Sequence, residues 1–127
     1  MRLVLDTSVL IDHLRGRPAA ATTLIPDAIE RGDELCSSYV VRAELLAGMR
    51  AGEEETTRDL MRLIAWYDVD EALSEAAGAL GRRYLASHQG IEVADLIVAA
   101  LTEQLDAELK TTNVKHFPMF KALRAPY

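Results

Sequence analysis

Three carboxylates in this sequence have apolar neighbours. Their positions are therefore not those of ordinary acidic residues on a water-exposed face. Asp6 ends an apolar run, Glu44 stands beside Leu45 on or next to a predicted core-facing stripe, and Asp95 interrupts the apolar stretch 93–101. An unpaired buried carboxylate is costly unless a cation or hydrogen bonds compensate it. A cluster of oxygen ligands without cysteine suits Mg²⁺ or Mn²⁺, which can bind phosphate oxygens and activate water. These residues therefore predict metal-assisted chemistry on a phosphate group.

Each carboxylate also has an ordinary structural explanation. Asp6 and Asp95 can both cap helices, because a carboxylate at a helix start accepts free N–H groups and faces the positive end of the dipole. Glu44 can lie at the edge of its stripe and reach water. A capping position can also direct a carboxylate into a crevice, so the two explanations of Asp6 and Asp95 are compatible.

The elements that must position these residues alternate between short apolar runs and longer helical patterns. Strands are predicted over residues 2–5, 34–37, 66–69 and 108–111, and helices over 7–15, 19–31, 39–48, from 53 onwards, 70–87 and 93–105, with a helical turn over 119–123. This alternation is typical of βαβ units and a mainly parallel sheet. Asp6 then ends the first strand, Glu44 follows the second and Asp95 precedes the fourth, so we expect the three to converge at one sheet edge.

Length and composition predict a single soluble domain over residues 1–127. The only cysteine, Cys36, excludes an internal disulfide and is predicted to be a small buried residue, which suits a reducing compartment. The N-terminus lacks the pattern of a signal peptide, and the longest apolar run, 96–101, is too short to cross a membrane. We therefore expect a cytoplasmic protein that does not contact membranes.

Charge is unevenly distributed along the chain. The net charge is −6, which argues against unspecific adhesion of the whole surface to nucleic acid. Residues 109–127 nevertheless carry Lys110, Lys115, Lys121 and Arg124 and no acid. This basic end could guide a phosphate backbone towards the acidic site, or it could serve only solubility.

Four stretches of the chain resemble the PIN-domain ribonucleases, specifically the VapC toxins of bacterial type II toxin–antitoxin systems. They are residues 5–8 (LDTS), 41–48 (VRAELLAG), 93–100 (VADLIVAA) and 111–117 (TTNVKHF). Each motif alone is weak, but the four occur in the right order over nearly the full chain. The resemblance implies a PIN-like three-layer α/β/α fold, with a mainly parallel central sheet of four or five strands flanked by helices.

The resemblance also implies a site. Asp6, Glu44 and Asp95 match the acidic residues of the family and would hold Mg²⁺, with Mn²⁺ as a substitute, while Thr7 or Ser8 would supply a supporting hydroxyl. The fourth acidic position of the family falls on Asn113, which keeps an oxygen acceptor but lacks the charge. The sequence therefore leaves open whether one or two metals bind.

The activity and partners implied by the resemblance are those of a toxin. The protein would cleave RNA as an Mg²⁺-dependent endoribonuclease, leaving a 5′-phosphate and a 3′-hydroxyl, and so inhibit translation and growth. A cognate VapB-like antitoxin would neutralise it by blocking the site. A homodimer and a toxin–antitoxin hetero-oligomer are the expected assemblies.

Two other classes of function stay open. A PIN-like module that binds RNA or a partner without cutting is compatible with Asn113 and the acidic surface. A phosphotransferase with Asp6 as nucleophile would need a second aspartate at the position of Ser8, and is disfavoured.

Other residues that could suggest function have simpler interpretations. The three histidines share no spacing typical of metal ligands, although His116 is close enough to the predicted site to contact a phosphate. Trp66 and Tyr67 are interpreted as core or interface residues rather than a platform for bases. The Ala-rich helical face over 72–85 could form a dimer interface, but packing against the core is the preferred interpretation.

Overall fold

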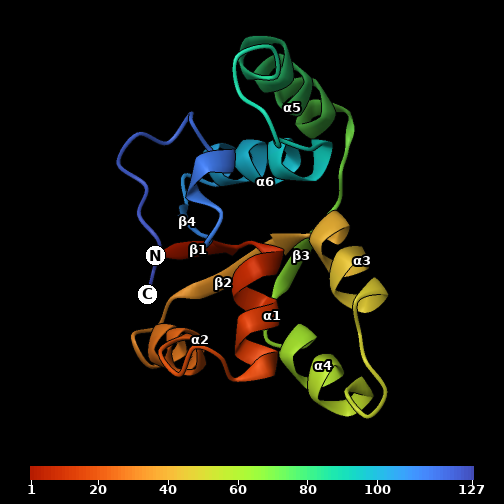
Figure 1. The fold of residues 1–127 in the computed structure, drawn as a ribbon, viewed down its shortest axis with the longest axis vertical. Coiled ribbons are helices and arrows are strands. Elements are labelled where there is room, and N and C mark those ends of the chain that lie inside the picture. Colours follow the sequence, from red (N-terminus) through yellow and green to blue (C-terminus); the bar gives the residue numbers. More distant parts are fainter.

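The computed structural model describes residues 1–127 and has a central four-stranded sheet between layers of helices (Figure 1). The strands are β1 (Arg2–Leu5), β2 (Glu34–Ser38), β3 (Ala65–Tyr67) and β4 (Glu108–Lys110). The helices are α1 (Thr7–Arg15), α2 (Ala21–Glu30), α3 (Tyr39–Ala47), α4 (Glu54–Met61), α5 (Glu71–Tyr84) and α6 (Val93–Gln104), followed by a short 3₁₀ helix, η1 (Val114–His116). The α/β/α fold class predicted from the sequence is confirmed.

All strand pairs in the sheet are parallel, and the strand order is β3-β2-β1-β4. Helix α6 contacts β1, β2 and β4, and α5 packs on the outside of α6 (Figure 1). Helices α1 and α2 contact each other below the sheet, while α3 contacts α1, α4 and α6. Because the strands are parallel, their carboxyl ends meet at one edge, and the helices that follow β1 and β2 begin there.

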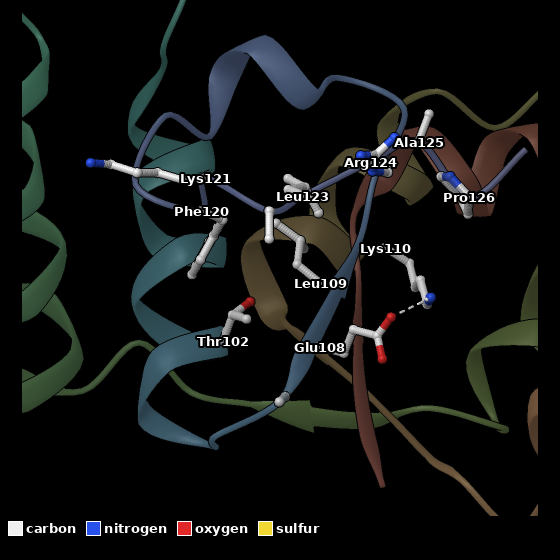
Figure 2. Close-up of a pocket in the computed structure, with 12 residues that line it drawn as sticks. Thr102, Glu108, Leu109, Lys110, Phe120, Lys121, Leu123, Arg124, Ala125 and Pro126 are labelled. Carbon is white, nitrogen blue, oxygen red and sulfur yellow. Dashed lines mark hydrogen bonds and ion pairs between the residues drawn. The ribbon is translucent and has the colours of Figure 1, made fainter.

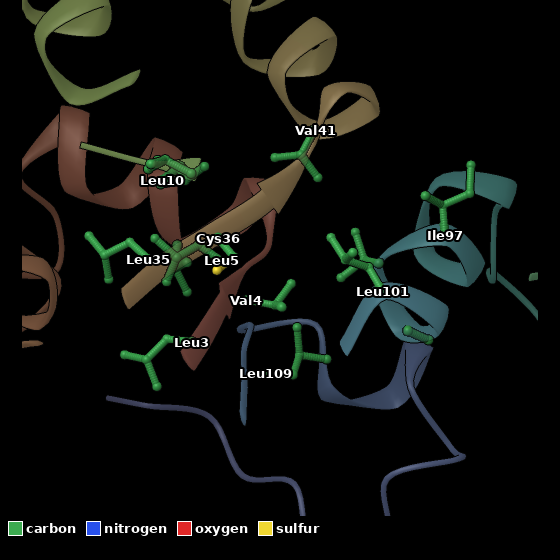
Figure 3. Close-up of a cluster of buried hydrophobic side chains, with 14 of the residues drawn as sticks. Leu3, Val4, Leu5, Leu10, Leu35, Cys36, Val41, Ile97, Leu101 and Leu109 are labelled. Atoms are coloured by element: carbon green, nitrogen blue, oxygen red, sulfur yellow. The ribbon is translucent and has the colours of Figure 1, made fainter. Parts of the chain in front are cut away.

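The hydrophobic core explains the continuous apolar run of β1. Leu3, Val4 and Leu5 are at most 1% exposed, because neighbouring strands flank β1 on both sides and helices cover both of its faces (Figure 3). Leu101 of α6 and Leu10 of α1 belong to the same core cluster as β1, and they come from the helical layers on either side of the sheet. Cys36 is completely buried in the same cluster, as the sequence predicted.

The Ala-rich face of α5 packs against the core, which confirms the preferred interpretation of that face. Leu73, Ala77 and Gly81 are buried on the side that faces α6. A Cβ atom at Gly81 would lie 3.1 Å from Leu96 Cδ1, so this glycine permits a close approach of the two helices. An apolar groove of about 570 Å³ lies between α5 and α6, and its lining includes Ala77, Gly81 and the exposed side chain of Val93.

The predicted element boundaries agree with the structure to within about three residues, and one predicted element is absent. Residues 119–123 form no helical turn: Phe120 and Leu123 each donate a backbone N–H to the residue three positions earlier, which makes two separate turns. Strand β3 ends before Asp68 because Asp70 caps α5 by accepting the Leu73 N–H at 2.8 Å. None of the helices combines the length and the apolar character that crossing a membrane would require.

Candidate active site

The three predicted carboxylates line a single pocket at the carboxyl edge of the sheet. This pocket has a volume of about 280 Å³, and its lining consists of Asp6, Thr7, Ser8, Ile11, Glu44, Glu92, Asp95, Asn113 and His116. The side chains come from the end of β1, from α1 and α3, from the start of α6 and from the segment after β4. The convergence expected from the order of strands and helices is therefore present in the structure.

Asp6 is almost completely buried and receives hydrogen bonds on both carboxylate oxygens. Oδ1 accepts the Thr7 backbone N–H at 2.9 Å, as an N-cap of α1 does. Oδ2 accepts the hydroxyl of Thr111 at 2.7 Å and lies 3.4 Å from Ser8 Oγ. Asp6 is 5% exposed, and these bonds compensate for the burial of its charge. Asp6 is thus both a helix cap and part of the pocket.

The hydroxyls around Asp6 also hold the segment that follows β4. Ser8 Oγ accepts the backbone N–H of Thr112 at 3.1 Å, and Thr111 Oγ1 accepts the backbone N–H of Asn113 at 3.0 Å. Ser8 thus bonds backbone 104 residues away in sequence, and Thr111 bonds Asp6 across 105 residues. Asn113 itself is exposed and lines the pocket, so its amide oxygen is accessible at the position where the family has a fourth acid.

Asp95 lies in the first turn of α6, and its carboxylate is mostly shielded from water. Its Oδ2 accepts the Glu92 backbone N–H at 2.9 Å and lies 3.4 Å from His116 Nδ1. Burial raises the pKa of Asp95, and the negative charge of Asp6 raises it further, while the Glu92 N–H and His116 act in the opposite direction. The two aspartates are therefore close enough to repel each other, which is the arrangement that a divalent cation would relieve.

Glu44 is exposed, which agrees with the alternative that it lies at the edge of the stripe and reaches water, and not with burial of its carboxylate. Val41 and Leu45 are the buried residues of this helix. Because each residue turns an α-helix by about 100°, Glu44 lies about 60° from Val41 and about 100° from Leu45, beside the buried face. Its Oε1 accepts the hydroxyl of Thr7 at 2.8 Å, which directs the side chain into the pocket.

The structure adds three residues to which the sequence prediction gave no definite role. Thr111 is completely buried and bonds Asp6, although its position directly after β4 gave the only hint. Glu92 precedes Asp95 by three residues, a spacing typical of reciprocal helix capping that could have been recognised. His116 contacts Asp95, and no spacing pattern with the other histidines could have revealed this contact.

Most of the basic C-terminal end lies away from the carboxylate pocket. Lys110, Lys121 and Arg124 all line a separate cavity of about 640 Å³ between β4 and the C-terminal segment, where Lys110 also pairs with Glu108 at 2.7 Å (Figure 2). Only Lys115, on η1 between Asn113 and His116, stands next to the carboxylate pocket in sequence. The charge cluster seen in the sequence is therefore not one basic surface beside the acidic site.

The donor set of the pocket fits a hard divalent cation, provided that water completes its shell. The side chains as placed do not gather into a group of three His, Cys, Asp or Glu that could hold a metal by themselves. Mg²⁺ does not require such a group, because it usually keeps several waters and uses one or two carboxylates plus substrate phosphates. Asp6 and Asp95 face the same pocket, and no cysteine or methionine lines it. The pocket therefore fits that mode of binding.

The PIN domain family model matches residues 3–118 of the chain. The chain is 45% identical to Ribonuclease VapC19 of Mycobacterium tuberculosis over the full length of both proteins. It is 39% identical to Ribonuclease VapC10 of the same species, covering 98% of this chain and 92% of the relative. The chain belongs to the PIN domain family. Within that family it groups with the VapC proteins, as the resemblance of its four motifs predicted.

Solved structures show the same fold. VapBC2 of Rickettsia felis, in a complex bound to a DNA fragment from its promoter, gives a TM-score of 0.78 at 20% identity, covering 98% of this chain and 97% of that one. A toxin–antitoxin complex from Klebsiella pneumoniae gives a TM-score of 0.76 at 23% identity, covering 98% of each chain. These similarities extend over all the elements that form the pocket.

Proposed function

We propose that this protein is an Mg²⁺-dependent endoribonuclease and the toxin of a type II toxin–antitoxin pair. The observation that carries this proposal is the convergence of Asp6, Glu44 and Asp95 on one pocket at the carboxyl edge of a parallel sheet. Membership of the PIN family and the ribonuclease names of relatives that match over their whole length support the assignment. By cutting RNA in the cytoplasm, the free toxin would inhibit translation and growth.

Asp6 and Asp95 would hold the cation, and Glu44 would contact it directly or through water. A divalent cation there would polarise a phosphate oxygen and help to activate the attacking water. The buried hydrogen bonds of Asp6 fix its carboxylate before substrate arrives, and the Glu92 N–H does the same for Asp95. Thr7 keeps Glu44 directed at the same space. Attack of water on the phosphorus would form a new P–O bond and break the P–O3′ bond; the water would lose a proton and the 3′-oxygen would gain one, which leaves a 5′-phosphate and a 3′-hydroxyl.

The decisive experiment is cleavage of a purified RNA by the wild-type protein and by Asp6→Asn and Asp95→Asn. We expect Mg²⁺-dependent cleavage by the wild type, its loss in EDTA, and its recovery with Mn²⁺. Both variants should lose activity while keeping the circular dichroism spectrum of the folded protein. Retained turnover in either variant, from a preparation free of other nucleases, would contradict the assignment.

A passive RNA-binding module is the second candidate, and one observation favours it. The carboxylates do not form a ready metal-binding group of three, and the fourth position carries the neutral Asn113. Calorimetric titration with Mn²⁺, in the absence and presence of RNA, separates the two candidates. Uptake of metal supports the nuclease, whereas no uptake under either condition supports the passive module.

We further propose that a VapB-like antitoxin covers the carboxylate pocket and forms a hetero-oligomer with this protein. The neighbouring structures from K. pneumoniae and R. felis, which are complexes with antitoxins, support this proposal. Co-expression with a VapB-like antitoxin that binds this protein should protect cells from growth arrest. Homodimerisation stays a prediction, which light scattering of the purified chain will test.

A further inference from the structure

Helix α3 borders a second hollow, separate from the carboxylate pocket, that combines arginine with aromatic side chains. It has a volume of about 450 Å³ and is lined by Tyr39, Arg42, Arg58, Met61, Arg62 and Trp66. No residue is shared with the carboxylate pocket. Arg42 and Glu44 are two residues apart on α3, and helical geometry therefore places them on nearly opposite sides of the helix, about 200° apart.

The hollow is cationic on a chain that is acidic overall. Its lining has three arginines and no acid, whereas the whole chain carries a net charge of −6. Arg58 pairs with Glu54 at 3.1 Å, and Arg62 pairs with Asp59, both on the exposed surface of α4. Arg42 is half-buried and forms no ion pair. Its guanidinium is therefore free to bind an anion such as a phosphate.

Two aromatic rings stand beside these charges. Tyr39 is 48% exposed, which is high for an aromatic side chain, and its ring centroid lies 6.4 Å from that of Trp66 at an interplanar angle of 34°. Trp66 Nε1 donates to the Met61 carbonyl at 2.9 Å, so its polar edge is already satisfied within the protein. The rings thus offer apolar surface against which a planar base can stack.

The hollow is joined to the carboxylate pocket by α3. Tyr39 begins the helix and Glu44 follows five residues later, a distance of about 7.5 Å along the axis at 1.5 Å per residue. Trp66 pairs in register with Ser37 of β2, directly before the turn into α3. The axial distance is short, but Arg42 and Glu44 lie on nearly opposite sides of α3, so a single strand that occupies the carboxylate pocket must pass around the start of this helix to reach the hollow.

We propose that this hollow binds single-stranded RNA next to the cleavage site. Arg42 contacts a backbone phosphate, and Tyr39 and Trp66 stack on an adjacent base. That the bound RNA is also the substrate for cleavage rests on the proposed nuclease function. RNA fits better than an acidic peptide, because an acidic peptide would use the arginine charges but would leave the exposed Tyr39 ring without a planar partner.

The test uses Trp66, the only tryptophan of the chain, as a reporter. A short oligouridylate is titrated into the full-length protein in EDTA, where no cleavage occurs, and the tryptophan fluorescence is followed. We expect saturable quenching that weakens with rising salt. Tyr39→Ala should weaken binding about tenfold, because stacking on an aromatic ring contributes substantially per base, whereas Tyr39→Phe should bind nearly as the wild type does.

Arg42→Gln is compared with Arg83→Gln, which removes the same charge from the exposed side of α5. We expect Arg42→Gln to weaken binding about fivefold or more and to flatten the salt dependence by about one charge, with little effect of Arg83→Gln. Equal weakening by both variants, or no quenching by RNA, would overturn the proposal. Quenching by an acidic peptide but not by RNA would assign the hollow to a protein partner and overturn it as well.

The proposed function and this inference can fail separately. Asp95→Asn should still show RNA-dependent quenching of Trp66 in EDTA while cleaving nothing, because Asp95 lies outside the hollow. A wild-type protein that binds RNA at Trp66 but never cleaves it would refute the nuclease and leave the hollow as an RNA site. A protein that cleaves RNA without any change in Trp66 fluorescence would refute RNA binding at the hollow but not the nuclease function.

Discussion

Thr111 Oγ1 donates a hydrogen bond of 2.7 Å to Asp6 Oδ2 across 105 residues of sequence, and both residues are buried. The contact follows from the parallel register of β1 and β4, in which Leu5 pairs with Lys110 and the Asp6 N–H donates to the Lys110 carbonyl. The hydroxyl of Thr111, directly after β4, therefore holds a candidate metal ligand in place at the end of β1.

Replacing Thr111 with valine should weaken both stability and cleavage. The side chain keeps its shape, but Asp6 loses its shortest hydrogen bond, and the unfolding free energy should fall by about 1–2 kcal/mol. Chemical denaturation measures the first effect and RNA cleavage under saturating Mg²⁺ the second. Thr112→Val is the matched control, because the Thr112 side chain makes no hydrogen bond in the structure, and an equal loss in that variant would contradict the role of Thr111.

Replacing Thr7 with valine should change the direction of the Glu44 side chain with little effect on the stability of the fold. Its hydroxyl bonds the exposed Glu44, so the stability change should stay within about 0.5 kcal/mol. Cleavage should nevertheless decline, because Glu44 is then free to swing out of the pocket. Glu44→Gln provides the comparison: if Glu44 matters for cleavage but Thr7→Val has wild-type activity, the hydrogen bond is unimportant.

Asp95→Asn should make the metal-free protein more stable at neutral pH. Burial raises the pKa of Asp95 in the folded protein, so folding favours its protonated form. This contribution is fully present below the pKa of the unfolded chain and is lost as pH rises through the folded pKa. Thermal unfolding is measured in EDTA from pH 4 to pH 8. The unfolding temperature of the variant should rise relative to that of the wild type as pH rises. A variant less stable than the wild type at every pH would refute this.

Asn113→Asp should strengthen metal binding. Asn113 lines the pocket as a neutral, exposed amide, and aspartate would add a charged oxygen ligand there. Mn²⁺ calorimetry should show higher affinity or a second bound ion compared with the wild type. Unchanged affinity and stoichiometry would show that residue 113 stands too far from the ion to act as a ligand.

Cys36 should resist modification in the native state. It is completely buried, and burial raises the pKa of its thiol, so the reactive thiolate is both scarce and shielded. A chromogenic disulfide reagent should label it only after denaturation. Rapid labelling of the native protein would mean that β2 opens far more often than its packing suggests.

The sequence by itself determined most of the fold. The apolar runs and helical patterns placed every strand and helix to within a few residues, because β1 and α6 are buried and therefore had to be apolar almost throughout. The same contrast marked Asp6 and Asp95, since a carboxylate within a buried segment is conspicuous. The prediction of a pocket shared by three acids followed from the places of these residues at a strand end and on helices next to strands of a parallel sheet.

The tertiary structure decided what local pattern could not. Glu44 stands on an exposed face and owes its direction to Thr7, and Asp6 owes its position to Thr111; both contacts join residues far apart in sequence. Tyr39 and Arg42 are neighbours on α3, but Trp66 of β3 joins them in one hollow only through tertiary packing. The separation of Lys121 and Arg124 from the carboxylate pocket is likewise a product of the tertiary structure. Spacing along a chain reports which face of an element a residue occupies. Which partners meet that face is fixed only when strands and helices pack.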